Sequence, residues 1–177
     1  MQDHLDSTAY SENRAEQRDR LWSLIKDIRF AMFTSQDENG HLHAWPMTTQ
    51  NKTIDEENSL WFFMSLRSDP VNNIEDDPVV NVSYADPSSD SYVSVSGIAT
   101  IVNDTAKAQQ LWSKMAEAWF PTGPNDPDLA LVKVRIISAS YWDVKDSKIV
   151  QLFKMAKAAM TGTQPRNMGE HADIRMR

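Results

Sequence analysis

The segment spanning residues 41–68 constrains the fold most, because two runs rich in aromatic and apolar residues flank a polar stretch. Such a pattern is typical of two strands joined by a turn. The first run carries Pro46 in its middle. Proline has no backbone N–H to donate, so it is confined to edge strands, bulges and strand ends. The segment therefore predicts a pair of strands, the first of which lies at an edge of a sheet.

The two predicted strands also carry side chains suited to a ligand. Met47 and the aromatic residues of the second run offer apolar contacts, while Ser65, Arg67 and Ser68 supply hydroxyls and a cation at the end of that run. Arginine binds phosphate through a planar fork of donors, and hydroxyls complete the shell. The combination predicts a seat for a flat, amphipathic ligand with a phosphate tail. The structural alternatives are an ordinary strand with a bulge at Pro46 and a solvated surface arginine.

Composition excludes several classes of function. A chain of 177 residues with 41% hydrophobic residues is long enough for one domain with a sizeable core. Its net charge of -7 disfavours non-specific binding to nucleic acid. The absence of cysteine excludes disulfides and thiolate chemistry.

His41 and His43 lack a third ligand at suitable spacing, so no metal site is expected. No apolar run reaches the length of a membrane span, and a cytoplasmic location is expected.

Strand patterns dominate the rest of the chain. We expect a flexible N-terminus over residues 1–11, a single domain over 12–160 and a polar tail over 161–177. Within the domain, a helix from Glu12 precedes antiparallel strands. Three further helices are expected, capped by Asp69 with Pro70 at the first helical position, by Asp104 or Asn103, and by Ser147. Separate strands are expected over 130–137 and 140–144. This order predicts a mainly β (α+β) fold, a small antiparallel barrel with flanking helices.

A set of short strings follows in a consistent order along roughly residues 21–163. They are Trp45-Pro46-Met47-Thr48, Leu60-Trp61-Phe62-Phe63, Asp77-Pro78, Val80-Asn81-Val82-Ser83-Tyr84-Ala85-Asp86, Tyr92-Val93-Ser94-Val95-Ser96-Gly97, Trp119-Phe120-Pro121, Asp126-Pro127-Asp128-Leu129-Ala130-Leu131, Tyr141-Trp142-Asp143 and Lys154-Met155-Ala156-Lys157-Ala158. Together they resemble the general stress protein branch of the pyridoxamine 5'-phosphate oxidase-like family, the FMN-binding split barrels.

The resemblance implies a split barrel of six to seven antiparallel strands that holds FMN, or alternatively riboflavin or FAD, at a homodimer interface. The cofactor-binding residues that it implies, together with those read from the strands above, are Trp45, Pro46, Met47, Thr48, Thr49, Phe63, Met64, Ser65, Arg67, Ser68, Tyr92 and Trp142. Two positions depart from the family pattern. Trp45 replaces an arginine, and Pro70 stands near the place of a basic residue.

The function implied by the resemblance is that of an FMN-binding general stress protein. The alternatives are a flavin-dependent oxidoreductase with a nicotinamide donor, a pyridoxamine 5'-phosphate oxidase-like enzyme, or an interaction domain that keeps the fold without a flavin. A flavin can carry redox chemistry without a protein acid or base, so no catalytic residue is predicted.

Overall fold

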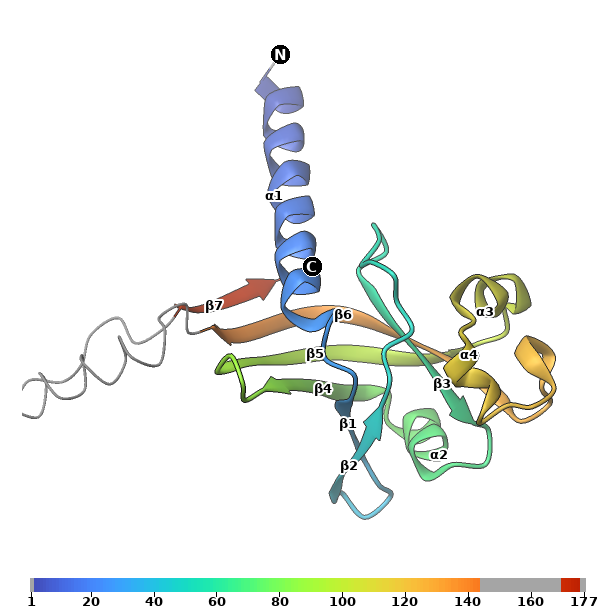
Figure 1. The fold of residues 1–177 in the computed structure, drawn as a ribbon. Helices are drawn as coiled ribbons and strands as arrows, with labels where there is room; N and C mark the ends of the chain where they lie inside the picture. Colours follow the sequence, from blue (N-terminus) through green and yellow to red (C-terminus); the bar gives the residue numbers. More distant parts are fainter. Residues whose placement is uncertain (1, 144–169, 176–177) are drawn as a thin grey trace, which may run out of the picture.

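In the computed structural model, which describes residues 2–143 and 170–175, seven antiparallel strands form one curved sheet (Figure 1). The strands are β1 (Ala31–Gln36), β2 (Leu42–Met47), β3 (Ser59–Ser65), β4 (Val79–Asp86), β5 (Ser91–Val102), β6 (Leu129–Asp143) and β7 (Glu170–Arg175). The helices are α1 (Gln2–Ile25), α2 (Asp69–Asp76), α3 (Thr105–Leu111), α4 (Lys114–Glu117) and the short 3-10 helix η1 (Gly123–Asn125). The predicted split β-barrel of six to seven antiparallel strands with flanking helices is confirmed.

The barrel closes weakly between its two terminal strands. The strand order is β2-β1-β4-β5-β6-β3, with β7 paired to β6, so β2 and β3 lie at opposite ends of the path. They approach each other where an isolated bridge joins Thr49 to Phe62 and the Gln50 N–H donates to the Trp61 carbonyl at 2.8 Å. The split in the barrel therefore lies along β2, and Pro46 stands on that edge strand, as its missing donor requires.

Alternating side chains build the core inside the barrel. On β5, Val93, Val95 and Ala99 are buried, as its period of two predicts. Phe33 of β1 and Phe62 of β3 are fully buried, and their rings meet edge to face with centroids 5.6 Å apart. This contact joins β1 and β3 across the interior of the barrel, because aromatic pairs add stabilisation beyond their buried area.

Gly97 sits where two strands come closest. The register of β5 on β6 shifts between Ser96 and Gly97, which marks a bulge. A Cβ at position 97 would lie 2.6 Å from the carbonyl oxygen of Arg135 and 2.6 Å from a methyl of Val134. Only glycine fits this approach, so the bulge that bends the long strands around the barrel depends on it.

Several boundaries differ from the sequence expectations. The first helix begins at Gln2 rather than at Glu12, so residues expected to be a flexible end are helical. The two strands expected over 130–137 and 140–144 are one strand, β6. Residues 170–175, which lie in the expected polar tail, form β7 against the end of β6. The helix expected from Ser147 lies outside the described residues.

The helical caps also bear on the site. Asp104 caps α3 as predicted, since its carboxylate accepts from the Lys107 N–H at 2.9 Å. The cap of α2 is Ser68 instead of Asp69, which moves Pro70 one residue into the first turn.

Within the described part of the chain, no helix has the length and apolar character needed to cross a bilayer.

Candidate functional site

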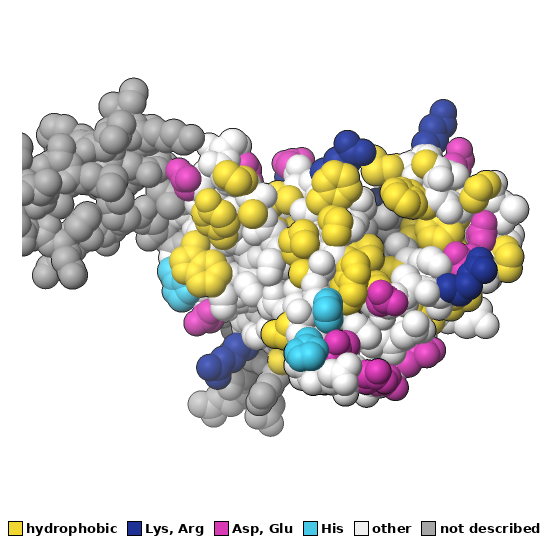
Figure 2. Space-filling model, turned by 90° about the horizontal axis from the view of Figure 1, so that it is seen from below, with side chains coloured by type: hydrophobic (Ala, Val, Ile, Leu, Met, Phe, Trp, Pro, Cys, Tyr) yellow, Lys and Arg dark blue, Asp and Glu magenta, His cyan; other side chains and the backbone are white. Residues whose placement is uncertain are grey.

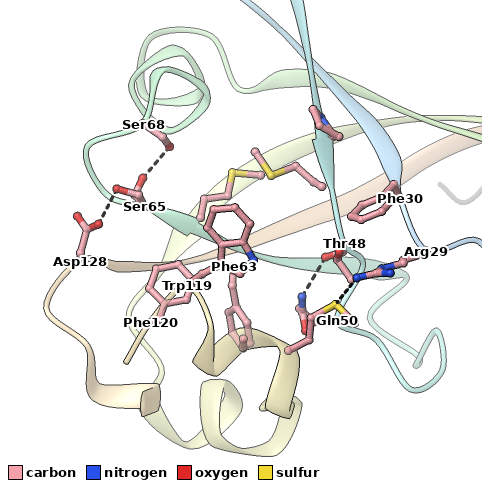
Figure 3. Close-up of a pocket in the computed structure, with 15 residues that line it drawn as sticks. Arg29, Phe30, Thr48, Gln50, Phe63, Ser65, Ser68, Trp119, Phe120 and Asp128 are labelled. Carbon is pink, nitrogen blue, oxygen red and sulfur yellow. Dashed lines mark hydrogen bonds between the residues drawn. The ribbon is translucent and has the colours of Figure 1, made fainter. Parts of the chain in front are cut away.

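A cavity of about 500 Å³ opens beside the split, between β2, β3 and the segment around α4. This volume is in the range of small-molecule sites. The residues that line it are Arg29, Phe30, Pro46, Met47, Thr48, Gln50, Phe63, Met64, Ser65, Ser68, Met115, Ala116, Trp119, Phe120 and Asp128. Figure 3 shows aromatic rings between two polar ends. The cavity therefore combines an apolar middle with polar groups at its ends, as a flat amphipathic ligand requires.

Seven of the twelve residues predicted from the sequence line this cavity within one chain. They are Pro46, Met47, Thr48, Phe63, Met64, Ser65 and Ser68. They come from the end of β2 and the end of β3, which are far apart in the strand order and meet only through barrel closure. The seven residues therefore lie together at one cavity, and their role in binding a ligand stays a prediction.

The other five predicted residues lie elsewhere in the single chain. Trp45 is half-buried and packs against the His43 ring, with centroids 5.8 Å apart. The Thr49 hydroxyl and the Tyr84 phenol share a hydrogen bond of 2.7 Å. The Arg67 side chain is 84% exposed and does not line the cavity. Tyr92 and Trp142 also lie outside the lining of the cavity.

Tyr92 and Trp142 form an exposed aromatic pair at the far end of β5 and β6. They face each other in the strand register, and both are exposed, at 40% and 44%. Trp142 also contacts the ring of His171 on β7, with centroids 5.0 Å apart. Neither residue lines the cavity of its own chain, so a contact with the same ligand would require a second subunit.

The predicted phosphate cluster contains a carboxylate that the sequence did not indicate. The Ser65 hydroxyl donates to Asp128 at 2.7 Å, and the Arg67 Nε donates to the other carboxylate oxygen at 3.0 Å. The Ser68 hydroxyl donates to the Ser65 carbonyl at 2.6 Å. The hydrogen bond from Ser65, with that from Arg67, holds the pKa of Asp128 below its usual value. This end of the cavity therefore carries a negative charge at neutral pH.

Arg29 and Phe30 mark the other end of the cavity. The Arg29 guanidinium lies over the Phe30 ring, 4.9 Å from its centroid, and one of its nitrogens is 3.9 Å from the Met115 sulfur. No carboxylate of the described residues forms an ion pair with Arg29. Gln50, beside Thr48 at this end, donates to the Thr48 carbonyl at 3.1 Å. The cavity is thus cationic at one end and anionic at the other.

Hydrophobic side chains surround the mouth of the cavity. Phe30, Met115 and Trp119 all line it, yet they are 53%, 45% and 79% exposed. Figure 2 shows hydrophobic side chains gathered across the face seen from below. Exposed apolar surface on this scale is typical of an interaction or ligand site.

Sequence reasoning missed part of the lining. It did not select Arg29, Phe30 or Asp128, which lie on segments that only the fold brings to the split, nor Gln50, which directly follows the selected Thr49. Trp119 and Phe120 also line the cavity. Trp112 packs against Phe63, with ring centroids 5.4 Å apart, behind the cavity lining. A turn such as Asp126-Pro127-Asp128 gives no signal of a ligand by itself.

Thr49 offers a direct test of which threonine serves the structure. Burial raises the pKa of the Tyr84 phenol, so this group is neutral and needs a hydrogen-bond partner. Thr49→Val should remove that partner and lower the free energy of unfolding by about 1 kcal/mol. Urea unfolding checks the value. Thr48→Val, at the neighbouring position that lines the cavity, should leave stability unchanged. Equal stability losses for the two variants would contradict this division of roles.

Comparison with known proteins points to one family. The family model described as pyridoxamine 5'-phosphate oxidase like matches residues 16–166. Protein bli-3 of Neurospora crassa is 25% identical over 154 residues, which cover 80% of this chain and 72% of that protein.

Two solved structures are also similar. A protein assigned as general stress protein 26, from Jannaschia sp. CCS1, superposes with a TM-score of 0.72 and is 25% identical, over 92% of this chain and 99% of that one. The general stress FMN/FAD binding protein of Xanthomonas citri superposes with a TM-score of 0.62 and is 28% identical, over 75% of this chain and 92% of that one.

Proposed function

Because the chain belongs to the pyridoxamine 5'-phosphate oxidase-like family, we propose that it is a flavin-binding general stress protein. The ligand would be FMN, with riboflavin or FAD as the alternatives. The observation that carries the proposal is the cavity beside the split, where seven predicted flavin-binding residues converge. The similarity to the FMN/FAD binding protein of Xanthomonas citri supports the same ligand class.

The cavity suits the two chemical parts of a flavin. An isoalloxazine ring needs apolar contact on its faces and hydrogen-bond donors along its polar edge. Met47, Phe63 and Trp119 supply apolar walls, and the edge strand β2 brings backbone groups beside them. The serine end of the cavity offers hydroxyls to the ribityl chain. In this account Thr48 and Gln50 lie at the ring end, and Ser65 and Ser68 lie at the tail end.

The same proposal places the flavin at the interface of a homodimer. Phe30, Met115 and Trp119 leave apolar surface exposed around the cavity mouth, and a second subunit would cover it. Tyr92 and Trp142, exposed and remote from the cavity of their own chain, would be available to the cavity of the partner. Two equivalent sites would then form, each completed by both subunits.

Absorbance spectroscopy of the purified protein tests the proposed ligand class. We expect flavin absorption in the protein as isolated, or after addition of FMN or riboflavin and removal of the unbound ligand. Adding a nicotinamide donor then separates binding from reduction, since bleaching of the flavin band would indicate an oxidoreductase. A protein that stays colourless after loading with either flavin would contradict the proposal.

A further inference from the structure

The tail end of the cavity already contains an anion of its own. Asp128 lines the cavity with Ser65 and Ser68, whereas Arg67 does not. Each carboxylate oxygen accepts one hydrogen bond, one from the Ser65 hydroxyl at 2.7 Å and the other from the Arg67 Nε at 3.0 Å. The main chain holds the two segments together, because the Leu66 N–H donates to the Asp128 carbonyl at 2.8 Å. Two of the three predicted phosphate donors, Ser65 and Arg67, therefore already donate to a carboxylate.

The surrounding charges do not offset this carboxylate inside the cavity. Among the described residues, Arg67 is the only cation paired with Asp128. Its side chain is largely exposed to solvent, so its charge is screened and offsets the carboxylate only weakly. The adjacent helix α2 begins with another carboxylate, Asp69, followed by Pro70. A phosphate placed at this end would meet the Asp128 carboxylate before the guanidinium behind it. Like charges at such distances repel each other.

We propose that Asp128 is a specificity-determining residue, which disfavours a phosphate at the tail end of the cavity and accepts hydrogen bonds from the hydroxyls of an unphosphorylated ligand. The inference rests on the proposed function, since it concerns which flavin the same cavity prefers. It predicts that riboflavin competes well with FMN in the natural protein. The carboxylate also keeps Ser65 oriented, so the hydroxyl remains in place when no ligand is bound.

Asp128→Asn tests the proposal by removing the charge and keeping the shape. Asparagine can still accept from Ser65, and its amide group can donate to a phosphate. At one pH and one salt concentration, the FMN affinity relative to riboflavin should rise about tenfold in this variant. Riboflavin affinity itself should change little. Fluorescence titration with both flavins measures the ratio.

The matched control is Asp126→Asn, in the same loop. Asp126 does not line the cavity, and its carboxylate accepts from the Thr122 hydroxyl and the Asp128 N–H. This substitution changes the net charge equally, so it should shift the FMN-to-riboflavin ratio by less than about twofold, as expected for a more distant, screened charge. If Asp128→Asn does not fold, Asp128→Ser removes the same charge with a smaller neutral side chain.

The outcomes distinguish this inference from the proposed function. Binding of both flavins with an unchanged ratio in the Asp128 variants would overturn the inference alone. The inference would also be overturned if Arg29→Ala lowered the FMN affinity relative to riboflavin while Asp128→Asn left this ratio unchanged. That result would place the phosphate at the opposite end of the cavity. Failure of either flavin to bind the natural protein and every variant would overturn the proposed function together with the inference.

Discussion

Replacing Phe30 with glutamate should separate the protein into monomers and abolish tight flavin binding. Phe30 lines the cavity mouth and is 53% exposed, so its ring is available to a second subunit without being part of the core. In the proposed dimer Phe30 would be an interface aromatic. Truncating such a residue costs about 2 kcal/mol or more, and a buried carboxylate adds a desolvation penalty. We therefore expect the dimer dissociation constant to rise at least about a hundredfold, which sedimentation velocity would measure.

The control for this prediction is Leu42→Glu. Leu42 is also an exposed apolar residue, at 73%, but it lies at the start of β2 and does not line the cavity. It should leave both the dimer and the flavin affinity unchanged. If the natural protein itself sediments at the 20.2 kDa of one chain at micromolar concentration, the interface account is wrong.

Trp119→Ala should weaken FMN and riboflavin equally, by about 1–3 kcal/mol each, if the indole stacks on the flavin ring. Trp119 lines the cavity and is 79% exposed, so its loss should leave the free energy of unfolding almost unchanged. Calorimetric titration of both flavins provides the two affinities.

The neighbouring Phe120 supplies the contrast. It also lines the cavity, but it is only 6% exposed, so Phe120→Ala should lower stability as well as affinity. A loss confined to FMN in Trp119→Ala would mean that the indole contacts the phosphate-bearing tail, and the proposed orientation of the ligand would be reversed.

Local patterns predicted the barrel well because they reflect local physics. The alternation of Val93, Val95 and Ala99 on β5 and the donor missing at Pro46 are properties of single strands, and both appear as expected. Element boundaries such as the start of α1 and the cap of α2 were misjudged by local patterns, and the strand β7 arises from pairing over a long distance. Residues 170–175 become a strand only because the end of β6 offers a free edge, which no pattern in a polar tail reveals.

The same distinction explains the site. Met47 and Phe63 were predictable because they lie on the two strands that flank the split. Asp128 was not, because its role depends on a loop that the fold brings against Ser65 from 63 residues away. Arg67 was selected for its donor fork beside two serine hydroxyls, and the structure shows that its charge is already paired with Asp128. Electrostatic roles depend on neighbours in space, so sequence spacing identifies them poorly.

The most direct test of the whole account is a calorimetric titration of the flavin-free protein with riboflavin and with FMN, combined with the measured mass of the complex. We predict saturable binding of one flavin per chain to a dimer, with affinities for the two flavins that differ by less than about a hundredfold, the span of one charge-assisted contact. Binding of neither flavin, or one flavin bound to a monomer, would contradict the account.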